Sequence, residues 1–330
     1  MKRRFLLLFL VFLLFLPSCK KKEESVVKEY LSTLEVTFLD VGQADSALIE
    51  CDGEYLLIDG GNVDDSSLIA SHLQKKNIDY IDVVVGTHAH EDHIGGLAGA
   101  LSVASAGTVF SPIDNYDSEA FRNFKKYAGE LTVPSIPYEF ELGDATVTFI
   151  SPLKEYEDIN NTSIIIKITH GKNSFLFMGD AEYDAETDII ESGADLSADV
   201  LKVGHHGSST SSSYRFIREV MPKYAVISVG TDNTYQHPHE EVVSRFEDAG
   251  STILRTDLSG DIVVISDGEN LKVSSGKKEV PEVREYIGNI KSKVFHKSNC
   301  SSLPAKHNRI YFDSKKEAIK LGYKECSNCK

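Results

Sequence analysis

The sequence lacks a long apolar run, is poor in cysteine and shows no internal repeat. Its longest uninterrupted apolar run is the twelve residues Phe5–Leu16, whereas a transmembrane helix needs about 20. Five cysteines among 330 residues do not indicate a disulfide framework, because a body of this size needs no covalent staples. The length suits one large domain with a small appendage, or two medium domains. With 41% hydrophobic and 26% charged residues, the composition indicates a folded globular protein and argues against a multi-span membrane protein.

Positive charge is scarce outside the C-terminal end of the chain. The net charge is −15 overall, but residues 286–330 contain ten Lys/Arg and three Asp/Glu, so this segment carries +7 and the rest carries −22. This asymmetry predicts an acidic body and a basic C-terminal module, and the basic module is where a polyanion would dock.

The N-terminal residues have the pattern of an export signal. Three basic residues at 2–4 precede the apolar run, which ends in Leu16-Pro17-Ser18-Cys19. This ending resembles the lipobox of bacterial lipoproteins, and the resemblance implies that Cys19 is lipidated. We expect a signal peptide at 1–19, a polar tether at 20–33, and a protein anchored by its lipid to the membrane and facing outside the cytoplasm. A transmembrane anchor, or a cysteine present by chance, is the alternative.

Residues 34–273 alternate short β-branched runs with amphipathic stretches. The pattern predicts strands at 34–40, 47–51, 55–59, 82–86, 145–150, 163–169, 174–178, 199–203, 224–229, 252–255 and 262–266, and helices at 66–76, 94–101, 118–127, 183–191, 212–220 and 240–249. An early meander followed by strand-helix alternation favours an α/β fold with mixed sheets layered with helices. A break at 274–285 predicts a linker to a module at 286–330.

The strongest motif follows the apolar strand Val83-Val84-Val85. It contains His88, His90, Asp92 and His93 and ends in Gly95-Gly96. Imidazole and carboxylate together are ligands for zinc, manganese or iron. A strand that runs directly into a helix can aim these side chains at two adjacent points. The alternative is a cluster of polar surface residues.

This HxHxDH motif with Gly-Gly is similar to the signature of the metallo-β-lactamase superfamily. The resemblance implies a four-layer αββα sandwich and a dinuclear metal site, and it covers about residues 34–273. By this resemblance, Asp59 supports the ligand loop. The first metal is held by His88, His90 and Asp180. The second metal is held by Asp92, His93, Asp180 and His205.

Within the superfamily, the chain resembles the extracellular hydrolase domain of the ComEC competence proteins. The likeness rests on residues 38–46 (FLDVGQADS), on Asn160-Asn161 where other branches carry a metal-binding histidine, on His205-His206-Gly207-Ser208, and on His237-Pro238. The membrane channel of ComEC is absent, so only the hydrolase activity carries over. Without the third histidine, we expect the first metal position to be weaker and more open, and either to be filled only with substrate or to prefer manganese over zinc.

Two divalent metals, zinc or manganese, suit phosphodiester hydrolysis. At about 3.5–4 Å apart they lower the pKa of a bridging water and neutralise charge on a phosphoryl oxygen. The candidate catalytic residues are Asp92, His206 and His237, with the two histidines stabilising phosphoryl oxygens or protonating the leaving alkoxide. Alternatively, His237 caps a turn beside Pro238, and His206 orients His205.

Other polar residues and one cysteine are given no catalytic role. Asp40, Gln43 and Asp45 either line the cleft or form a turn. Cys51 is expected to be a thiol in or near the core. The remaining histidines, His72, His170, His239 and His307, are interpreted as surface or loop residues.

The C-terminal segment contains a second ligand pattern. His296 and Cys300, then 25 residues, then Cys326 and Cys329 match a closed tetrahedral zinc site that holds a small domain together. Unpaired thiols or a disulfide of Cys300 are the alternatives. Residues 286–330 resemble the Ada-type metal-binding domain, which implies a DNA-binding accessory module. Tyr311 and Phe312 then serve as stacking groups or form a small core.

These observations predict a membrane-tethered, extracytoplasmic, metal-dependent phosphodiesterase or nuclease that acts on DNA, linked to DNA uptake or nutrient salvage. The net charge of −25 over residues 19–285 counts against a polyanionic substrate. One alternative is a hydrolase of small esters, lactones or β-lactams, which leaves the basic module without a purpose. Another is a DNA-binding lipoprotein without catalysis, which leaves the open ligand set unexplained.

Overall fold

The computed structural model of the protein describes residues 31–276, 286–297, 300–305, 308–312 and 314–329. The predicted signal peptide, Cys19, most of the tether and most of the linker lie outside these residues. None of the helices in the described part of the chain is long and apolar enough to cross a membrane.

Seven strands of the described chain form the first sheet, in the order β14-β13-β1-β2-β3-β4-β5. Their bounds are β1 (Leu34–Phe38), β2 (Ala47–Cys51), β3 (Glu54–Ile58), β4 (Tyr80–Val85), β5 (Ser105–Phe110), β13 (Ile262–Ser266) and β14 (Leu271–Ser275). β4 runs parallel to β3 and β5, and the other neighbours are antiparallel. The sheet is mixed, as the sequence predicts.

The second sheet has the order β12-β11-β10-β9-β8-β7-β6. Its strands are β6 (Tyr138–Leu142), β7 (Ala145–Phe149), β8 (Ile166–His170), β9 (Asn173–Phe177), β10 (Val200–Lys202), β11 (Tyr224–Ile227) and β12 (Thr252–Arg255). β9 to β12 are parallel, and β6 to β9 pair in antiparallel fashion. The parallel half supplies the strand ends that carry Asp180 and the His205-His206 pair.

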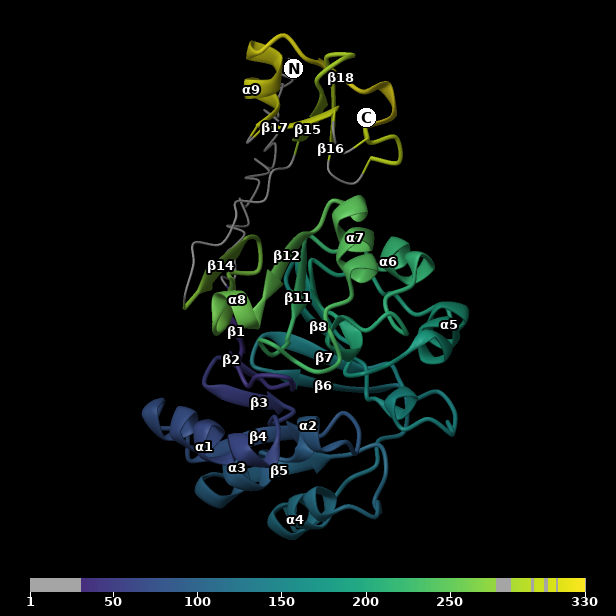
Figure 1. The fold of residues 1–330 in the computed structure, drawn as a ribbon. Coiled ribbons are helices and arrows are strands. Elements are labelled where there is room, and N and C mark those ends of the chain that lie inside the picture. Colours follow the sequence, from purple (N-terminus) through teal and green to yellow (C-terminus); the bar gives the residue numbers. More distant parts are fainter. Residues whose placement is uncertain (1–30, 277–285, 298–299, 306–307, 313, 330) are drawn as a thin grey trace, which may run out of the picture. The chain divides into compact units, whose positions relative to one another are not determined.

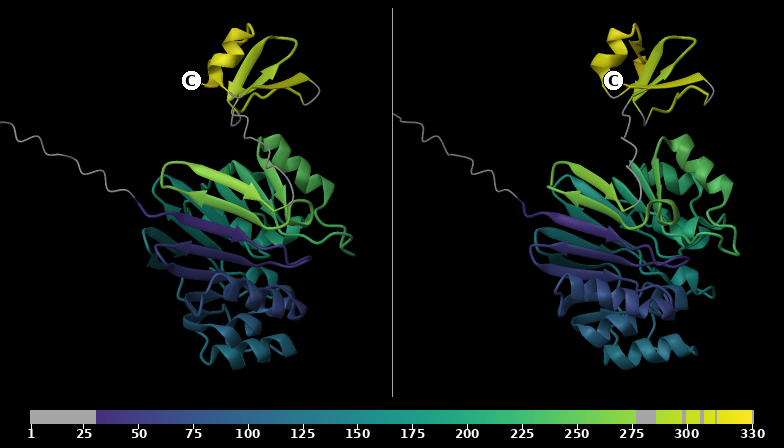
Figure 2. Two further views of the ribbon diagram at one scale, coloured as in Figure 1. Left: turned by 90° about the vertical axis from the view of Figure 1, so that its left-hand side faces the viewer. Right: turned by 60° about the vertical axis from the view of Figure 1, so that its left-hand side comes forward.

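The two sheets face each other and helices cover their outer faces (Figures 1 and 2). Alternate strand residues such as Val36 and Phe38 of β1 and Val147 and Phe149 of β7 fill the core between the sheets. The first sheet is covered by α1 (Ser66–Lys75), α2 (Glu91–Ile94), α3 (Leu97–Val103) and α4 (Glu119–Ala128). The second is covered by α5 (Tyr183–Glu191), α6 (Tyr214–Val220) and α7 (Glu240–Ala249). This architecture confirms the predicted αββα sandwich.

Within residues 34–276, the strands that the sequence pattern misses lie at sheet edges. β5 and β14 are the two edges of the first sheet, and β6 is one edge of the second. Edge strands face solvent along one side and so carry fewer apolar residues, as the pattern of β6, Tyr-Glu-Phe-Glu-Leu, illustrates.

Two predicted boundaries need correction. The linker does not begin at residue 274, because β14 continues to Ser275, which pairs with Ile262 of β13. The helix predicted at 94–101 is instead divided between α2 and α3, with Gly95 and Gly96 between them.

Two of the residues without an assigned role are deeply buried. Cys51 is a free thiol in the core, as predicted. The interpretation of His170 as a surface residue is wrong, because its side chain is fully buried and its Nδ1 lies 2.8 Å from the Ser266 hydroxyl.

The C-terminal residues form a small domain of their own. Its sheet has the order β17-β15-β16-β18, with β15 (Tyr286–Asn289), β16 (Val294–Lys297), β17 (Arg309–Phe312), β18 (Lys324–Glu325) and the helix α9 (Lys315–Lys320). Four residues make its core: Phe295, Phe312, Ala318 and Tyr323. Phe312 therefore packs inside, whereas Tyr311 is 43% exposed.

Candidate metal centre

The histidine motif is held in place by Asp59, at the end of β3. The Asp59 carboxylate accepts hydrogen bonds from the Thr87 amide and hydroxyl and contacts His93 Nδ1, each at 2.8 Å. This contact fixes the His93 ring so that its Nε2 lies 3.2 Å from an Asp180 carboxylate oxygen. Such an outer carboxylate is what orients a metal-binding imidazole.

The glycines that follow the motif allow its helix to approach Asp59. Gly60 donates to the His93 carbonyl at 2.7 Å, and Gly96 donates to the Gly61 carbonyl at 3.0 Å. A side chain on Gly96 would collide with the Gly60 carbonyl. The motif therefore needs glycine here for close packing.

Four side chains converge at the carboxyl ends of the strands. One ligand atom each from Asp92, His93, Asp180 and His206 lies within 4.8 Å of the others. In the described chain, His93 Nε2, His206 Nε2 and Asp180 Oδ1 are buried and form no hydrogen bond, although His93 Nε2 lies 3.2 Å from Asp180 Oδ1 and His206 Nε2 lies 3.3 Å from Asp92. Buried polar atoms normally have a partner, and two imidazoles with two carboxylates are the donor set for a divalent cation. The residues present therefore fit a metal.

The structure places His206, not His205, in this cluster. His206 is 2% exposed, and its Nε2 lies 3.3 Å from Asp92 and 3.6 Å from Asp180. His205 Nε2 lies 3.7 Å from Asp180, and its Nδ1 contacts Glu182 at 3.0 Å. In this cluster His206 therefore takes the place in which His205 was expected.

His88 and His90 form the other half of the motif. His88 Nε2 lies 3.1 Å from His90 Nδ1, and the buried His88 ring packs on His93 with centroids 4.1 Å apart. The two imidazoles are therefore in hydrogen-bond contact beside the Asp92, His93, Asp180 and His206 cluster.

Asn160 and Asn161 have different surroundings. Asn161 Oδ1 accepts from the Glu182 amide at 2.9 Å and from the Ala185 amide at 3.3 Å, so it holds the start of α5. Asn160 lines the same cleft as His90, and its Oδ1 is buried without a hydrogen bond in the described part of the protein. Asn160 is therefore the residue that can supply an oxygen where other branches have histidine.

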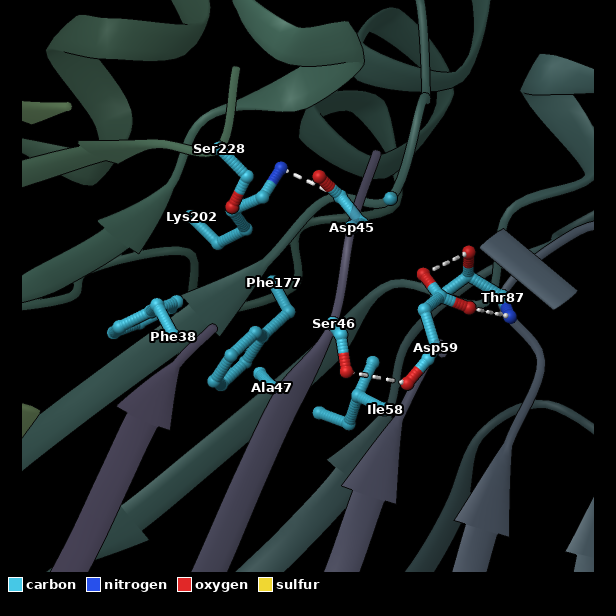
Figure 3. Close-up of a pocket in the computed structure, with 11 residues that line it drawn as sticks. Phe38, Asp45, Ser46, Ala47, Ile58, Asp59, Thr87, Phe177, Lys202 and Ser228 are labelled. Carbon is cyan, nitrogen blue, oxygen red and sulfur yellow. Dashed lines mark hydrogen bonds and ion pairs between the residues drawn. The ribbon is translucent and has the colours of Figure 1, made fainter. Parts of the chain in front are cut away.

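A buried ion pair lies behind His206 and was not predicted from the sequence. Lys202 Nζ, at the end of β10, lies 2.6 Å from one Asp45 oxygen, and His206 Nδ1 lies 3.2 Å from the other. Figure 3 shows Lys202 and Asp45 pointing toward each other in an internal pocket that Asp59 and Ser228 also line. The sequence signal is a lysine in the otherwise apolar run 200–203. Asp45 thus does more than form a turn.

The carboxylates make this place favourable for positive charge. Burial alone lowers the pKa of His93, but Asp180 and Asp59 outweigh it and raise that pKa well above its usual value. Burial likewise opposes protonation of His206, but Asp180 and Asp45 raise its pKa to about 10. A bound cation would replace these protons.

His237 lies on the rim of the cleft. Its backbone is tied to Asn233, whose side chain bonds both the His237 amide and carbonyl. Gln43 Nε2 lies 3.4 Å from His237 Nδ1, and the Gln43 Oε1 accepts from the Gly230 amide. Burial and the neighbouring His206 lower the pKa of His237 to about 4. His237 is therefore neutral near pH 7, and both its ring and Gln43 line the cleft.

Replacing Asp45 by asparagine should weaken metal binding at the His206 position. We expect the affinity of one of two metals to fall by about 10- to 100-fold, because Asp45→Asn removes the charge that orients the His206 ring. Titration with a competing chelator measures both affinities. Asp82→Asn is a matched control, since Asp82 accepts a backbone hydrogen bond from Tyr55 elsewhere in the sheet. Wild-type affinity at both positions in the Asp45 variant would refute this role.

The C-terminal domain brings its four predicted ligands together. His296, Cys300, Cys326 and Cys329 form one cluster, and all three cysteines are free thiols. Burial opposes ionisation of Cys300, but hydrogen bonds with Cys329 and Ser302 outweigh it and lower its pKa to about 6. Three thiols and an imidazole are the ligand set of a structural zinc.

The fold and these two clusters agree with comparisons to known proteins. The chain belongs to the metallo-β-lactamase superfamily, which residues 39–231 match, and residues 282–330 match the metal binding domain of Ada. It is a metal-dependent hydrolase of that fold with a C-terminal metal-binding domain, and it is related to competence proteins.

Three curated relatives illustrate that relation. They are ComE operon protein 3 of Bacillus subtilis (30% identity over 76% of this chain and 34% of the relative), competence protein ComA of Neisseria gonorrhoeae (32% over 68% and 31%) and recombination protein 2 of Haemophilus influenzae (29% over 78% and 32%). The chain thus spans about a third of the length of the relatives it matches.

Proposed function

We propose that the protein is a phosphodiesterase that cleaves DNA outside the cytoplasm while tethered to the membrane through Cys19. One observation carries the proposal: Asp92, Asp180 and His206 line an open cleft of about 380 Å³ that His205 and His237 also line. Such a cleft leaves room for a phosphodiester above the metals, with imidazoles beside it. The relatives named for competence and recombination support DNA as the substrate.

The proposal places two metal positions in the cleft. The convergence of Asp92, His93, Asp180 and His206 supports one of them. The other, held by His88, His90, Asp180 and Asn160, follows from the family resemblance and from the contact of His88 with His90. When bound, the two cations lower the pKa of a water molecule and offset charge on the phosphoryl oxygens. At the first position an amide oxygen replaces a histidine nitrogen. Because oxygen is the harder ligand, this position should favour Mn²⁺ over Zn²⁺.

His205 is placed to deliver a proton. Its Nδ1 contacts Glu182, which also accepts from the Thr210 hydroxyl at 2.7 Å. A carboxylate at Nδ1 holds the imidazole with Nε2 toward the cleft. His205 can therefore protonate the leaving oxygen, and neutral His237 can donate a hydrogen bond to a phosphoryl oxygen.

The basic C-terminal domain is proposed to hold DNA near the body. Residues 286–330 carry +7, whereas residues 19–285 carry −25. Electrostatic attraction to phosphates therefore has to come from the C-terminal domain and the metals. Binding should weaken steeply with added salt.

The test uses residues 20–330 with labelled single- and double-stranded DNA, in Mn²⁺, Zn²⁺ or EDTA. We expect cleavage with metal and none with EDTA, and a loss of more than about 100-fold in the His90→Ala/Asp92→Ala variant, because removal of a ligand costs more than removal of its outer partner. DNA binding should persist in that variant. Unchanged cleavage in the double variant would sink the proposal. If the protein hydrolyses a small ester or β-lactam but does not cleave DNA, the hydrolase domain acts on small molecules and the proposal is wrong.

A further inference from the structure

The loop between β11 and α7 presents an aromatic side chain at the cleft in a fixed position. Asn233 Nδ2 donates to the Gly230 carbonyl at 3.0 Å and to the His237 carbonyl at 2.7 Å, and its Oδ1 accepts from the His237 amide at 2.9 Å. The Gly230 amide in turn donates to Gln43. Hydrogen bonds at both ends of residues 231–236 thus set the conformation of the loop that carries Tyr235.

Tyr235 is 65% exposed, the highest value among the large hydrophobic side chains that the structure describes, yet it lines the metal cleft. Its ring lies nearly parallel to that of His237, with centroids 5.6 Å apart and an angle of 24°. His237 packs in turn against His239, with centroids 4.8 Å apart. One face of Tyr235 is therefore supported while the side chain as a whole remains open to solvent.

We propose that Tyr235, supported by His237, is a stacking site for the nucleobase next to the scissile phosphodiester. The proposal rests on the proposed phosphodiesterase function. A planar, preoriented ring loses little conformational freedom when a base stacks on it, and stacking tolerates any base because every base has an aromatic face. Tyr235 shares its cleft with Asp180 and His206, so a nucleotide whose phosphate lies over the metals has its base within reach of the rim.

The kind of substrate follows from this arrangement. A base can stack on Tyr235 only after it leaves the base stack of its own strand, and a duplex opposes that step. Tyr235 therefore selects single-stranded DNA or a frayed end over an intact duplex. Shape and stacking, not hydrogen bonds to base edges, provide the recognition, so little sequence preference is expected.

The experiment compares two single-stranded decamers in the presence of Mn²⁺: one of thymidine nucleotides, and one in which every sugar is an abasic tetrahydrofuran. Tyr235→Ala should lower kcat/KM for the thymidine decamer by about tenfold, mostly through KM, because stacking contributes that much per base. The same variant should leave cleavage of the abasic decamer unchanged, and Tyr235→Phe should retain wild-type values. Tyr214→Ala, which removes a tyrosine that is 59% exposed and lies outside the cleft lining, is the matched control and should change neither.

The outcomes separate the two proposals. Equal effects of Tyr235→Ala on both decamers, with cleavage otherwise intact, would overturn the stacking site alone. Failure of the wild-type protein to cleave either decamer with any metal would overturn the phosphodiesterase function, and the stacking site with it.

Discussion

Replacing His206 by alanine is expected to lower the rate of DNA cleavage by more than about 100-fold and to remove one bound metal ion per chain. The buried Nε2 of His206 faces Asp92 and Asp180 without a hydrogen bond, and its Nδ1 is occupied by Asp45 and the Ser228 carbonyl. One nitrogen of His206 thus faces the carboxylates and the other is held by an outer partner, which is the arrangement that a metal-binding imidazole has. Loss of the ligand itself should cost more than the 10- to 100-fold typical of its outer partners.

His205→Ala is the matched control for this experiment. His205 and His206 both have left-handed backbone, with φ of +50° and +52°, so the backbone constraint on an alanine is similar at the two positions. Any difference between the variants therefore reports on the side chains.

The two variants should differ in metal content as well as in rate. His205→Ala should keep both metals and lose activity mainly against substrates with a poor leaving group, since its proposed role is to protonate that group. Metal content by mass spectrometry and cleavage rates of diesters with good and poor leaving groups are the measurements. If His205→Ala loses a metal and His206→Ala keeps both, the ligand assignment from the structure is wrong.

The difference between these two histidines shows where the sequence stops being informative. Spacing places both residues after the same strand end, and both have a left-handed backbone and an Nε2 near Asp180. They differ in the partner of Nδ1, which is Glu182 for His205 and the buried Asp45 for His206. Two adjacent identical residues cannot be distinguished by pattern.

Asn160 and Lys202 illustrate the same limit for single residues. The motif position indicates that a histidine is missing, but not that Asn161 is used by the start of α5 while Asn160 Oδ1 stays without a partner. Lys202 reads as part of a strand, and its partner Asp45 is far from it in the chain. Only the contact between the two sheets brings their charges together.

The main features of the fold were predictable because they depend on regular patterns. The interior strand β11 is an apolar run, β1 alternates apolar and polar residues, and the HxHxDH motif directly follows the interior strand β4. The edge strands β5, β6 and β14 were missed because an edge does not require an apolar run, and pairing rather than composition defines them.

Replacing Cys326 by serine is expected to unfold the C-terminal domain while the hydrolase body remains folded. The core of that domain consists of four residues, which include Phe295 and Phe312. A core of this size is too small to stabilise the domain alone. A structural zinc site contributes about 10–16 kcal/mol of apparent binding free energy, and that energy supports folding. The body has three hydrophobic clusters of its own and depends on none of the four ligands.

Limited proteolysis of the full chain measures this effect. In Cys326→Ser the residues beyond β14 should be digested at once, leaving a resistant fragment that ends near Ser275, and one zinc equivalent should be lost. Ser327→Ala is the control, because Ser327 is exposed between Cys326 and Cys329 and is not part of the cluster.

Cys326→Ser also separates DNA binding from catalysis. In this variant the DNA affinity and its salt dependence should fall, whereas cleavage of a small phosphodiester should not change. A Cys326 variant that resists protease as well as wild type would mean that the cluster does not hold this domain together.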